Sequence, residues 1–520
     1  MRKFVTLGLA FYLGMSLSVA VNAAENVTPV SDAGTETVQE LPEDALQTET
    51  GQKVEASIEE IQKEIEKNEL LASLFEADIE TLRKALDMGL ITSRELTTYY
   101  MERIAVYNSN FNCFVTICDN VWEEADKRDA ELAAGTAQGK LFGIPVVVKD
   151  NMEYAGYYTT NGYSFKKSKI SRSNAAVVQH LFDEGAVIIG KTNMSTQAQD
   201  ARRSFSAAAG DTYNAYNPDM APGGSSGGSA VATSLNFAAA SLGTDTNSSL
   251  RYPAALNGCI SLRPTLGLIE KEGLIILNSR RDTAGAITRT VKDQAIMLSV
   301  IQGNGNYEEN LNSNALEGVR IGVLKEFVGA NSSVAGRTEN NIDSEVMMAF
   351  QGAILELQMC GAEIVEVSMP DIFRLSAKCG ENLSGWQAAK DKFYARYQQM
   401  FADNNISAVI FPTYLNSPLY LKNVSNFYGQ TYITNCNLLS SVIGVPEISV
   451  PIGVHSRGAG IGMEIAALKY EEQLLLNYAY AYTEKFNYRQ IPALAPDLYE
   501  VHASRNLADF ISDKENRSED

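Results

Sequence analysis

The sequence predicts an α/β protein in which short buried strands alternate with helices. Residues 143–150 form a β-branched run and residues 186–191 an apolar run, and each has the length and composition of a buried strand. Residues 175–182, between them, are helical in pattern. Such alternation favours a layered α/β architecture. With 45% hydrophobic and 20% charged residues among 520, the chain has the composition of a globular protein with an ample core.

The N-terminus has the pattern of a signal peptide, residues 1–23. Arg2 and Lys3 precede an apolar run that reaches Val21, and small residues up to Ala23 form a cleavage site. A membrane anchor is the alternative, but the run is short for a span and no cysteine follows it for lipid attachment. We therefore expect cleavage near Ala23 and an exported protein, secreted or on the outer side of the cell envelope, with no stable membrane anchor.

Polar, acidic segments flank the expected folded domain of residues 53–500. Residues 24–52 contain no Lys or Arg and little hydrophobic periodicity, which predicts a disordered acidic tether. Residues 501–520 are expected to form a loosely held C-terminal tail. The net charge is −20, or −20 − 2 = −22 after removal of the leader, so the composition disfavours a nucleic-acid partner.

Helices are expected first within the folded domain. Apolar residues recur at helical spacing over residues 54–65. Thr92 and Glu95 have the spacing of a capping box, which predicts that another helix begins there. The strand and helix alternation then continues, with strands predicted at 319–323, 363–367, 408–411 and 447–450 and a helix at 344–359.

The cysteines and histidines indicate no metal site. Six cysteines, at 113, 118, 259, 360, 379 and 436, are scattered, so export permits disulfides without requiring them. The histidines are His180, His455 and His502, and no cysteine pair stands beside one at metal-ligand spacing. We predict that the protein binds no metal and leave any disulfide pairing open.

Residues 220–264 combine small and hydroxyl side chains where an ordinary core would need bulk, which indicates a site. The clusters at 223–228 and 243–251 join glycines, which allow close backbone approach, to serines, which can act as nucleophiles or proton carriers. Lys149 ends the strand predicted before them. It is either a surface lysine or a buried one whose pKa falls because burial disfavours the charged form.

A serine nucleophile needs a base, and two kinds are open. Residues 223–227 fit the G-x-S-x-G elbow of α/β-hydrolases, for which His455 or His502 would have to be the base. The apolar strand that should precede such an elbow is missing, because residues 213–222 are rich in turns. The other option is a lysine base. A phosphate-binding loop is disfavoured because no Lys-Ser or Lys-Thr pair follows the glycines.

Three separated segments resemble the amidase signature family: residues 143–150, 222–229 and 243–254, with weaker matches at 281–285, 290–293, 411–413 and 444–451. The likeness extends from about residue 70 to residue 486 in the family's order. It implies one large domain with a mixed central β-sheet covered by helices on both faces, and a reaction that needs no cofactor.

The resemblance also implies roles for individual residues. Ser249 would be the nucleophile, Ser225 a bridging serine in a cis peptide, and Lys149 the base. Backbone N–H groups would form the oxyanion hole, at Thr246, Asn247, Ser248 and Ser249.

Neighbouring residues are expected to support this site. Asp245 and Arg251 flank the nucleophile and could pair to brace its loop, and Ser226, like Ser229, is expected to hold the loop by local hydrogen bonds.

The chain departs from the family pattern at the nucleophile loop. Asn247-Ser248 stands where the family usually has Gly-Gly. Asn tolerates left-handed φ better than most residues, and Ser248 would either narrow the space or donate an extra hydrogen bond. Ser261 and Arg263 replace the more usual Gly and Lys, which we expect to be tolerated.

These features predict an exported serine amidase that hydrolyses a carbon–nitrogen amide bond through an acyl-enzyme. Its substrate would be a peptide amide, an acylamide or an aryl amide, and export disfavours the amidotransferase subunit that works on charged transfer RNA. A catalytically silent scaffold and a Ser-His-Asp esterase are the alternatives. The aromatic residues Tyr158, Phe205, Trp386 and Tyr428 could line a pocket or the core equally well, so substrate and oligomeric state stay open.

Overall fold

The computed structural model describes residues 49–329, 342–380, 384–424, 435, 437–499 and 506–519. The predicted signal peptide and residues 24–48 of the predicted tether lie outside these ranges. The chain divides into one unit of Leu74–Leu498 with Asn506–Asp520 and another of Met1–Ser73 with Tyr499–Arg505. The smaller unit contains α3 (Glu49–Ala72), which includes the residues whose spacing predicts a helix at 54–65.

Among the described residues, eleven strands of the larger unit form one mixed sheet. They are β1 (Phe114–Ile117), β2 (Pro145–Lys149), β5 (Val187–Thr192), β8 (Ala240–Asp245), β9 (Ile260–Arg263), β10 (Thr283–Thr288), β11 (Arg320–Leu324), β12 (Glu363–Val367), β13 (Ala408–Pro412), β14 (Glu447–His455) and β15 (Ala459–Ala466). Their order across the sheet is β1-β5-β2-β8-β10-β9-β14-β15-β13-β11-β12. Two small hairpins lie outside it: β3 (Tyr158–Thr159) with β4 (Lys169–Ile170), and β6 (Phe205–Ser206) with β7 (Gly210–Asp211).

Parallel and antiparallel pairs alternate in blocks along this sheet. β2 pairs in parallel with both β5 and β8, and β11 pairs in parallel with both β13 and β12. The strands between these blocks, from β8 to β13, pair antiparallel. The sheet therefore has two parallel blocks joined by an antiparallel centre.

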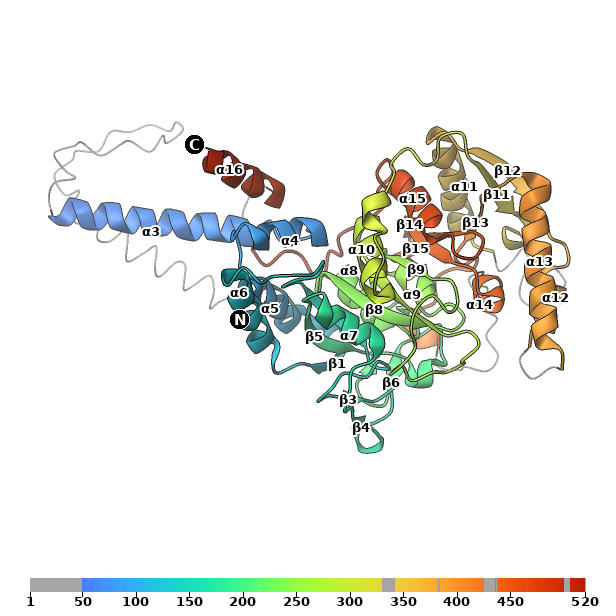
Figure 1. The fold of residues 1–520 in the computed structure, drawn as a ribbon, viewed down its shortest axis with the longest axis horizontal. Coiled ribbons are helices and arrows are strands. Elements are labelled where there is room, and N and C mark those ends of the chain that lie inside the picture. The colour runs from blue at the N-terminus through green and yellow to red at the C-terminus, as the bar shows by residue number, and fades with distance from the viewer. Residues whose placement is uncertain are drawn as a thin grey trace. The chain divides into compact units, whose positions relative to one another are not determined.

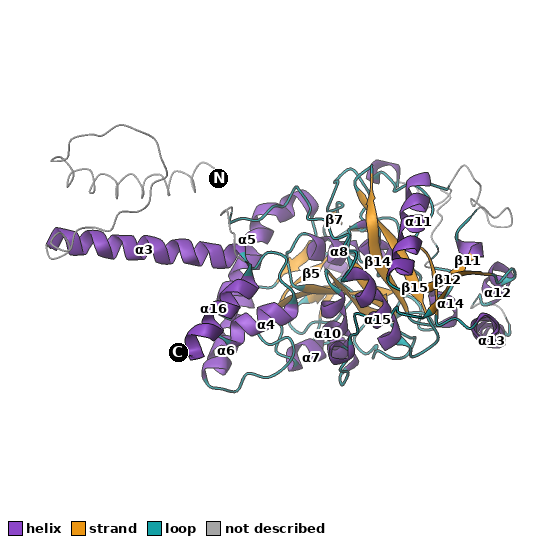
Figure 2. Ribbon diagram, turned by 90° about the horizontal axis from the view of Figure 1, so that it is seen from above, coloured by secondary structure: helices purple, strands orange, loops and turns teal. Residues whose placement is uncertain are grey.

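Helices cover both sides of the strands (Figures 1 and 2). The described helices of the larger unit are α4 (Ile79–Asp87), α5 (Ser93–Phe111), α6 (Val121–Ala133), α7 (Ala176–Asp183), α8 (Gly227–Ser234), α9 (Arg251–Leu256), α10 (Val291–Gln302), α11 (Ser344–Met359), α12 (Ile372–Lys378), α13 (Trp386–Asn404), α14 (Ser440–Ile443), α15 (Glu472–Thr483) and α16 (Leu507–Glu519). α10 packs against α7 and α15, whereas α8 packs against α9 and β8. The predicted fold class, a mixed sheet between helices, is confirmed.

The elements predicted from apolar runs are present. β2, β5, β11, β12 and β13 match their predicted positions to within two residues, and β14 continues beyond its predicted end to His455. The helix predicted at 344–359 is α11. The capping box before α5 is also present: the Thr92 hydroxyl accepts from the Glu95 N–H at 3.0 Å, and the Glu95 carboxylate accepts from the Thr92 N–H at 3.0 Å.

The far edge of the sheet has a well-packed apolar core that positions α13. Phe393, Tyr397, Met400 and Phe401 of this helix are buried in one cluster with residues of β11, β12, β13 and α12. Because these side chains follow the helical repeat, the opposite face of α13 is left for polar residues.

Within the segment predicted as a C-terminal tail, the structure contains α16. Leu507, Phe510 and Ile511 of this helix are buried, and Lys84 on α4 forms an ion pair of 2.7 Å with Glu515. Cys113, Cys118, Cys259, Cys360 and Cys379 are buried free thiols, and Cys436 lies outside the described residues. Over the ranges given above, no helix combines the length and hydropathy that a membrane span requires.

Candidate active site

The site forms where two neighbouring parallel strands end. Lys149 is the last residue of β2 and Asp245 the last residue of β8. The two strands pair in parallel, with Val148 opposite Leu242. Since the carboxyl ends of parallel strands meet at one edge of a sheet, the residues that follow β8 lie beside Lys149.

Lys149 is completely buried and has three hydroxyl partners. Its Nζ lies 2.7 Å from Ser225 Oγ, 2.8 Å from Ser226 Oγ and 2.9 Å from Thr244 Oγ1. Burial lowers the pKa of Lys149 from 10.5 to about 7, although the negative charges of Asp245 and Asp282 raise it. The interpretation of Lys149 as a surface lysine is therefore wrong, because β2 is covered on both faces.

The loop before α8 brings two serines to Lys149. Gly223 has a φ of +75°, a backbone conformation that favours glycine, and the peptide bond from Gly224 to Ser225 is cis, as the family resemblance implies. The N–H of Ser195 donates to the carbonyl of Ser225 at 3.3 Å, which ties this loop to the residues after β5.

Ser226 and Thr244 complete the surroundings of the lysine. Besides its contact with Lys149, Ser226 Oγ donates to the carbonyl of Thr244 at 3.2 Å. A Cβ on Gly243 would lie 2.8 Å from Ser226 Oγ, so glycine is needed there for the serine loop to approach β8. Thr244 Oγ1 also accepts from Asn151 Nδ2 at 3.0 Å. Thr244 is a site residue that the sequence analysis missed.

These contacts define how a neutral Lys149 would be oriented. A neutral amine has two N–H donors and one lone pair, whereas the ammonium has three donors. Ser226 Oγ and Thr244 Oγ1 can each accept one N–H. The lone pair then faces Ser225 Oγ, which can donate its own proton.

The nucleophile loop, residues 246–249, follows β8 directly. Ser249 is 4% exposed, and its carbonyl accepts from the Ser226 N–H at 3.3 Å, so the two serine segments are joined. In the described part of the chain, no protein group accepts a hydrogen bond from the N–H groups of Thr246, Asn247, Ser248 or Ser249. These four donors are therefore available, as the predicted oxyanion hole requires.

The departure at Asn247 and Ser248 is accommodated without a left-handed backbone. Asn247 is not among the residues with positive φ. Its exposed side chain accepts from Arg281 Nη1 at 2.9 Å, and its carbonyl accepts from Arg251 Nη2 at 2.8 Å. The Ser248 hydroxyl is buried and has no hydrogen-bond partner among the described residues. The loop thus offers an additional donor that Gly-Gly would lack.

A buried network of ion pairs stabilises the nucleophile loop. Arg251 Nε lies 3.2 Å from Asp245 Oδ2, so the predicted pair is present, and Arg251 Nη1 also contacts Glu447. Arg263 Nη1 lies 2.9 Å from Asp245 Oδ1. Burial alone would raise the pKa of Asp245, but the two arginines outweigh it and lower that pKa. Asp245 is therefore held as a carboxylate.

His455, one of the two histidines that the hydrolase-elbow alternative would need as base, contacts Asp343. His455 Nε2 is 3.2 Å from Asp343 Oδ2, and its Nδ1 accepts from the N–H of Arg457 at 3.0 Å. His502 lies outside the described residues. The contact of Ser225 Oγ is with Lys149, so the geometry favours the lysine-base alternative over the elbow.

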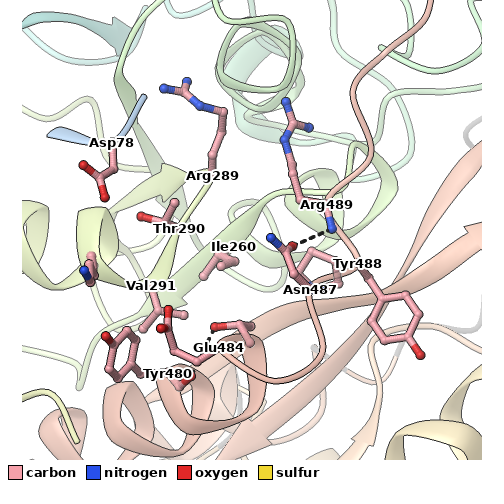
Figure 3. Close-up of a pocket in the computed structure, with 13 residues that line it drawn as sticks. Asp78, Ile260, Arg289, Thr290, Val291, Tyr480, Glu484, Asn487, Tyr488 and Arg489 are labelled. Atoms are coloured by element: carbon pink, nitrogen blue, oxygen red, sulfur yellow. Dashed lines mark hydrogen bonds between the residues drawn. The ribbon is translucent and has the colours of Figure 1, made fainter. Parts of the chain in front are cut away.

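A separate cavity of about 130 Å³ lies between the start of α10 and the end of α15. Figure 3 shows Asp78, Arg289, Glu484 and Arg489 around it. Its arginines are already engaged: Arg489 Nη2 lies 2.7 Å from a Glu76 carboxylate oxygen, and Arg289 Nη1 donates to the carbonyl of Ala238 at 2.8 Å. None of the predicted catalytic residues lines this cavity.

An α/β enzyme with a buried serine–lysine site is the class that this fold and geometry define. Across the described residues, no three His, Cys, Asp or Glu side chains are grouped to hold a metal ion. The chain belongs to the Amidase family, whose model matches residues 95–379. It is therefore an amidase-signature enzyme that acts on amide C–N bonds.

Known proteins support this assignment along most of the chain. The chain is 28% identical, over 492 residues, to a glutamyl-tRNA(Gln) amidotransferase subunit of Caldanaerobacter subterraneus subsp. tengcongensis, a match covering 81% of this chain and 98% of that protein. It is 38% identical over 290 residues to the corresponding subunit of Lawsonia intracellularis, covering 53% of this chain and 57% of that protein. The solved peptide amidase of Stenotrophomonas maltophilia aligns with a TM-score of 0.71 and 25% identity, over 81% of this chain and 99% of that one.

Proposed function

We propose that this protein is an exported serine amidase whose nucleophile is Ser249, with Ser225 as proton carrier and Lys149 as base. The substrate would be a peptide amide, an acylamide or an aryl amide, and water the final acceptor. The observation that carries the proposal is the 2.7 Å contact between Lys149 Nζ and Ser225 Oγ inside a fully buried site.

Acylation begins with neutral Lys149. The Ser249 hydroxyl attacks the amide carbonyl carbon while its proton passes to Ser225 Oγ, whose own proton passes to Lys149 Nζ. The carbonyl oxygen becomes an oxyanion, which accepts hydrogen bonds from N–H groups of the nucleophile loop. The proton then returns through Ser225 to the amide nitrogen, the C–N bond breaks, and the amine leaves.

Deacylation repeats these steps with water. Water gives one proton to the Ser225 and Lys149 relay and attacks the ester carbon of acyl-Ser249. The C–O bond to Ser249 breaks, the serine oxygen regains a proton, and a carboxylic acid is released. Ser226 and Thr244 support both halves of the reaction because they keep the lone pair of Lys149 directed at Ser225.

Export and the amidase reaction are supported by different parts of the chain. Export rests on the basic, apolar and small-residue pattern of residues 1–23. The net charge of −20 disfavours a function like that of the amidotransferase relatives, whose name refers to glutamyl-tRNA, because nucleic acid repels an acidic surface.

N-terminal sequencing of the protein recovered outside the cell should begin near Ala24. An uncleaved protein in the cell fraction would refute export.

Fluorophosphonate labelling with mass-spectrometric peptide mapping tests the nucleophile, because this reagent reacts with activated serines. The label should appear on Ser249 and be lost in Ser249→Ala. Ser229→Ala is a matched control, because Ser229 Oγ donates to the Leu242 carbonyl at 2.9 Å without contacting Lys149. Label on Ser225 would favour the elbow alternative, and an unlabelled folded protein would favour the silent scaffold.

A further inference from the structure

A row of cationic side chains begins at the nucleophile loop and continues along α13. We define this cationic row as Arg281, Lys390 and Lys469. Arg281 Nη1 reaches Asn247 Oδ1 at 2.9 Å, and Asn247 is two residues from Ser249, which limits the distance between their backbones to about 7 Å. One end of the row therefore lies beside the proposed oxyanion hole.

Aromatic side chains of α13 lie beside the row. Arg280 lies over the ring of Trp386, 4.2 Å from its centroid, which docks the first turn of α13 on the segment before β10. Lys390 and Tyr394 follow Trp386 at four-residue spacing and so share its face of the helix. Lys469 Nζ lies 4.3 Å from the centroid of the Tyr394 ring. Cations and aromatic rings thus alternate along one face of α13.

Lys390 is the residue on which the cations converge. It is half-buried, and burial together with the positive charges of Lys469, Arg263 and Arg281 lowers its pKa to about 8. Cys379 acts on the pKa of Lys390 in the opposite direction and raises it. An anion placed here would relieve repulsion between like charges and be partly shielded from water.

Asp391, the neighbour of Lys390 on α13, is hydrogen-bonded to another side chain of the same helix. The negative charge of Asp391 raises the pKa of Lys469. Asp391 Oδ1 accepts from Gln387 Nε2 at 3.0 Å on the exposed side of α13. The whole chain has a net charge of −20, so a cluster of cations beside the reacting serine is a local feature. Lys392, two residues further along α13, is exposed.

We propose that the cationic row binds a carboxylate on the amide substrate, with Lys390 as the residue that determines this specificity. The inference rests on the proposed function, since it names the substrate class of the same site. It does not require Lys390 to take part in bond making or breaking. The substrate would therefore be an amide that carries a carboxylate a few bonds from the scissile C–N bond.

Matched substrate pairs test this specificity on both sides of the amide. Glutaryl 4-nitroanilide is compared with valeryl 4-nitroanilide for an acyl-side charge, and 4-acetamidobenzoate with 4-acetamidotoluene for an amine-side charge. The wild type should prefer the carboxylate in one pair at least tenfold in kcat/KM. Lys390→Gln should reduce kcat/KM for that carboxylate about 10- to 100-fold, as expected for loss of one charge-assisted contact. It should change kcat/KM for the neutral partner by less than about twofold. The control Lys392→Gln should change neither.

Protection of Ser249 from fluorophosphonate provides a second measurement that needs no turnover. Glutaramic acid should slow labelling of the wild type more than valeramide does, and Lys390→Gln should abolish the difference. Equal behaviour of charged and neutral compounds in both measurements would overturn the carboxylate proposal while Ser249 labelling still upheld the amidase. An equal loss of kcat/KM for the charged and the neutral member of a pair in Lys390→Gln would also overturn the carboxylate proposal. Absence of both labelling and turnover would overturn the proposed function itself.

Discussion

Lowering the pH through 7 should switch this enzyme off, because its proposed base must be uncharged to accept a proton. Burial lowers the pKa of Lys149 from 10.5 to about 7. The neutral form therefore predominates above pH 7 and is lost as the pH falls through that value. For a substrate without a carboxylate, we expect kcat/KM to reach a plateau above about pH 8 and to fall tenfold for each pH unit below about pH 6.

The structure gives the size of the effect. At pH 7 about half of Lys149 is neutral, whereas about one in 3,000 molecules of a lysine with a pKa of 10.5 would be. The difference between the two pKa values corresponds to about 5 kcal/mol against the charged form. Because Lys149 is fully buried, solvent does not screen this penalty.

The assay is the rate of Ser249 labelling by a fluorophosphonate between pH 5 and 9, since this reagent requires no protonation of a leaving amine. Asp282→Asn is the informative variant. The charge of Asp282 raises the pKa of Lys149, so its removal should move the midpoint to lower pH. Asn keeps an acceptor for the N–H of Leu277. A flat profile, or a midpoint unmoved by this variant, would refute the assignment of the base.

Other substitutions test the surroundings of the site. Thr244→Val removes an acceptor of Lys149 and should lower kcat/KM about 10- to 100-fold with little change in Tm; unchanged activity would exclude its orienting role. Arg251→Met leaves buried carboxylates unpaired and should lower the free energy of unfolding by about 3–5 kcal/mol in urea titrations; a loss below about 1 kcal/mol would contradict the network. Ser248→Ala should lower kcat about tenfold at unchanged KM if the buried hydroxyl assists the oxyanion, and an unaltered kcat would assign it no such role.

The apolar strands and the three site segments could be predicted from the sequence, whereas the strands β8, β9 and β10 could not. β8 reads ASLGTD, and β9 and β10 likewise contain small and hydroxyl residues, so they lack the β-branched runs that identify β2 and β5. Gly243 shows the reason: a larger residue would collide with Ser226. At β8 the small residues let a loop approach the strand, and the sequence signal of a buried strand is lost there.

Thr244 was missed because its role depends on the order of the strands. Its position in the quoted Gly243-Thr244-Asp245 segment is visible in the sequence, but its contact with Lys149 depends on β8 lying next to β2. Glu447 was missed because its ion pair with Arg251 depends on the strand order that places β14 beside β9. Motifs identify residues that do the chemistry, and strand order decides which residues support them.

The replacement at Arg263 also proves to be part of the site's support. Its guanidinium donates from Nη1 to Asp245 and from Nη2 to the carbonyl of Arg281, so two separate nitrogens in a rigid fork reach the two acceptors, whereas a lysine has a single nitrogen. It thereby joins the end of β8 to the segment before β10. Arg281, held in this way, is the residue that reaches Asn247 on the nucleophile loop.

The charges of the buried ion network link the arginines that stabilise the nucleophile loop to the pKa of Lys149. Among the described residues, two arginines, Arg251 and Arg263, face the carboxyls of Asp245, Glu447 and Glu464. Burial raises the pKa of both glutamates, and the negative charge of each would raise that of the other, so a second charge on this pair is disfavoured.

Asp245 keeps its negative charge because Arg251 and Arg263 lower its pKa. That charge is also one of the two that raise the pKa of Lys149 against burial. The carboxylate that braces the nucleophile loop therefore also keeps the pKa of the base near neutrality, since burial alone would lower it further. A change to either arginine should accordingly alter the pH dependence of catalysis as well as the stability of the fold.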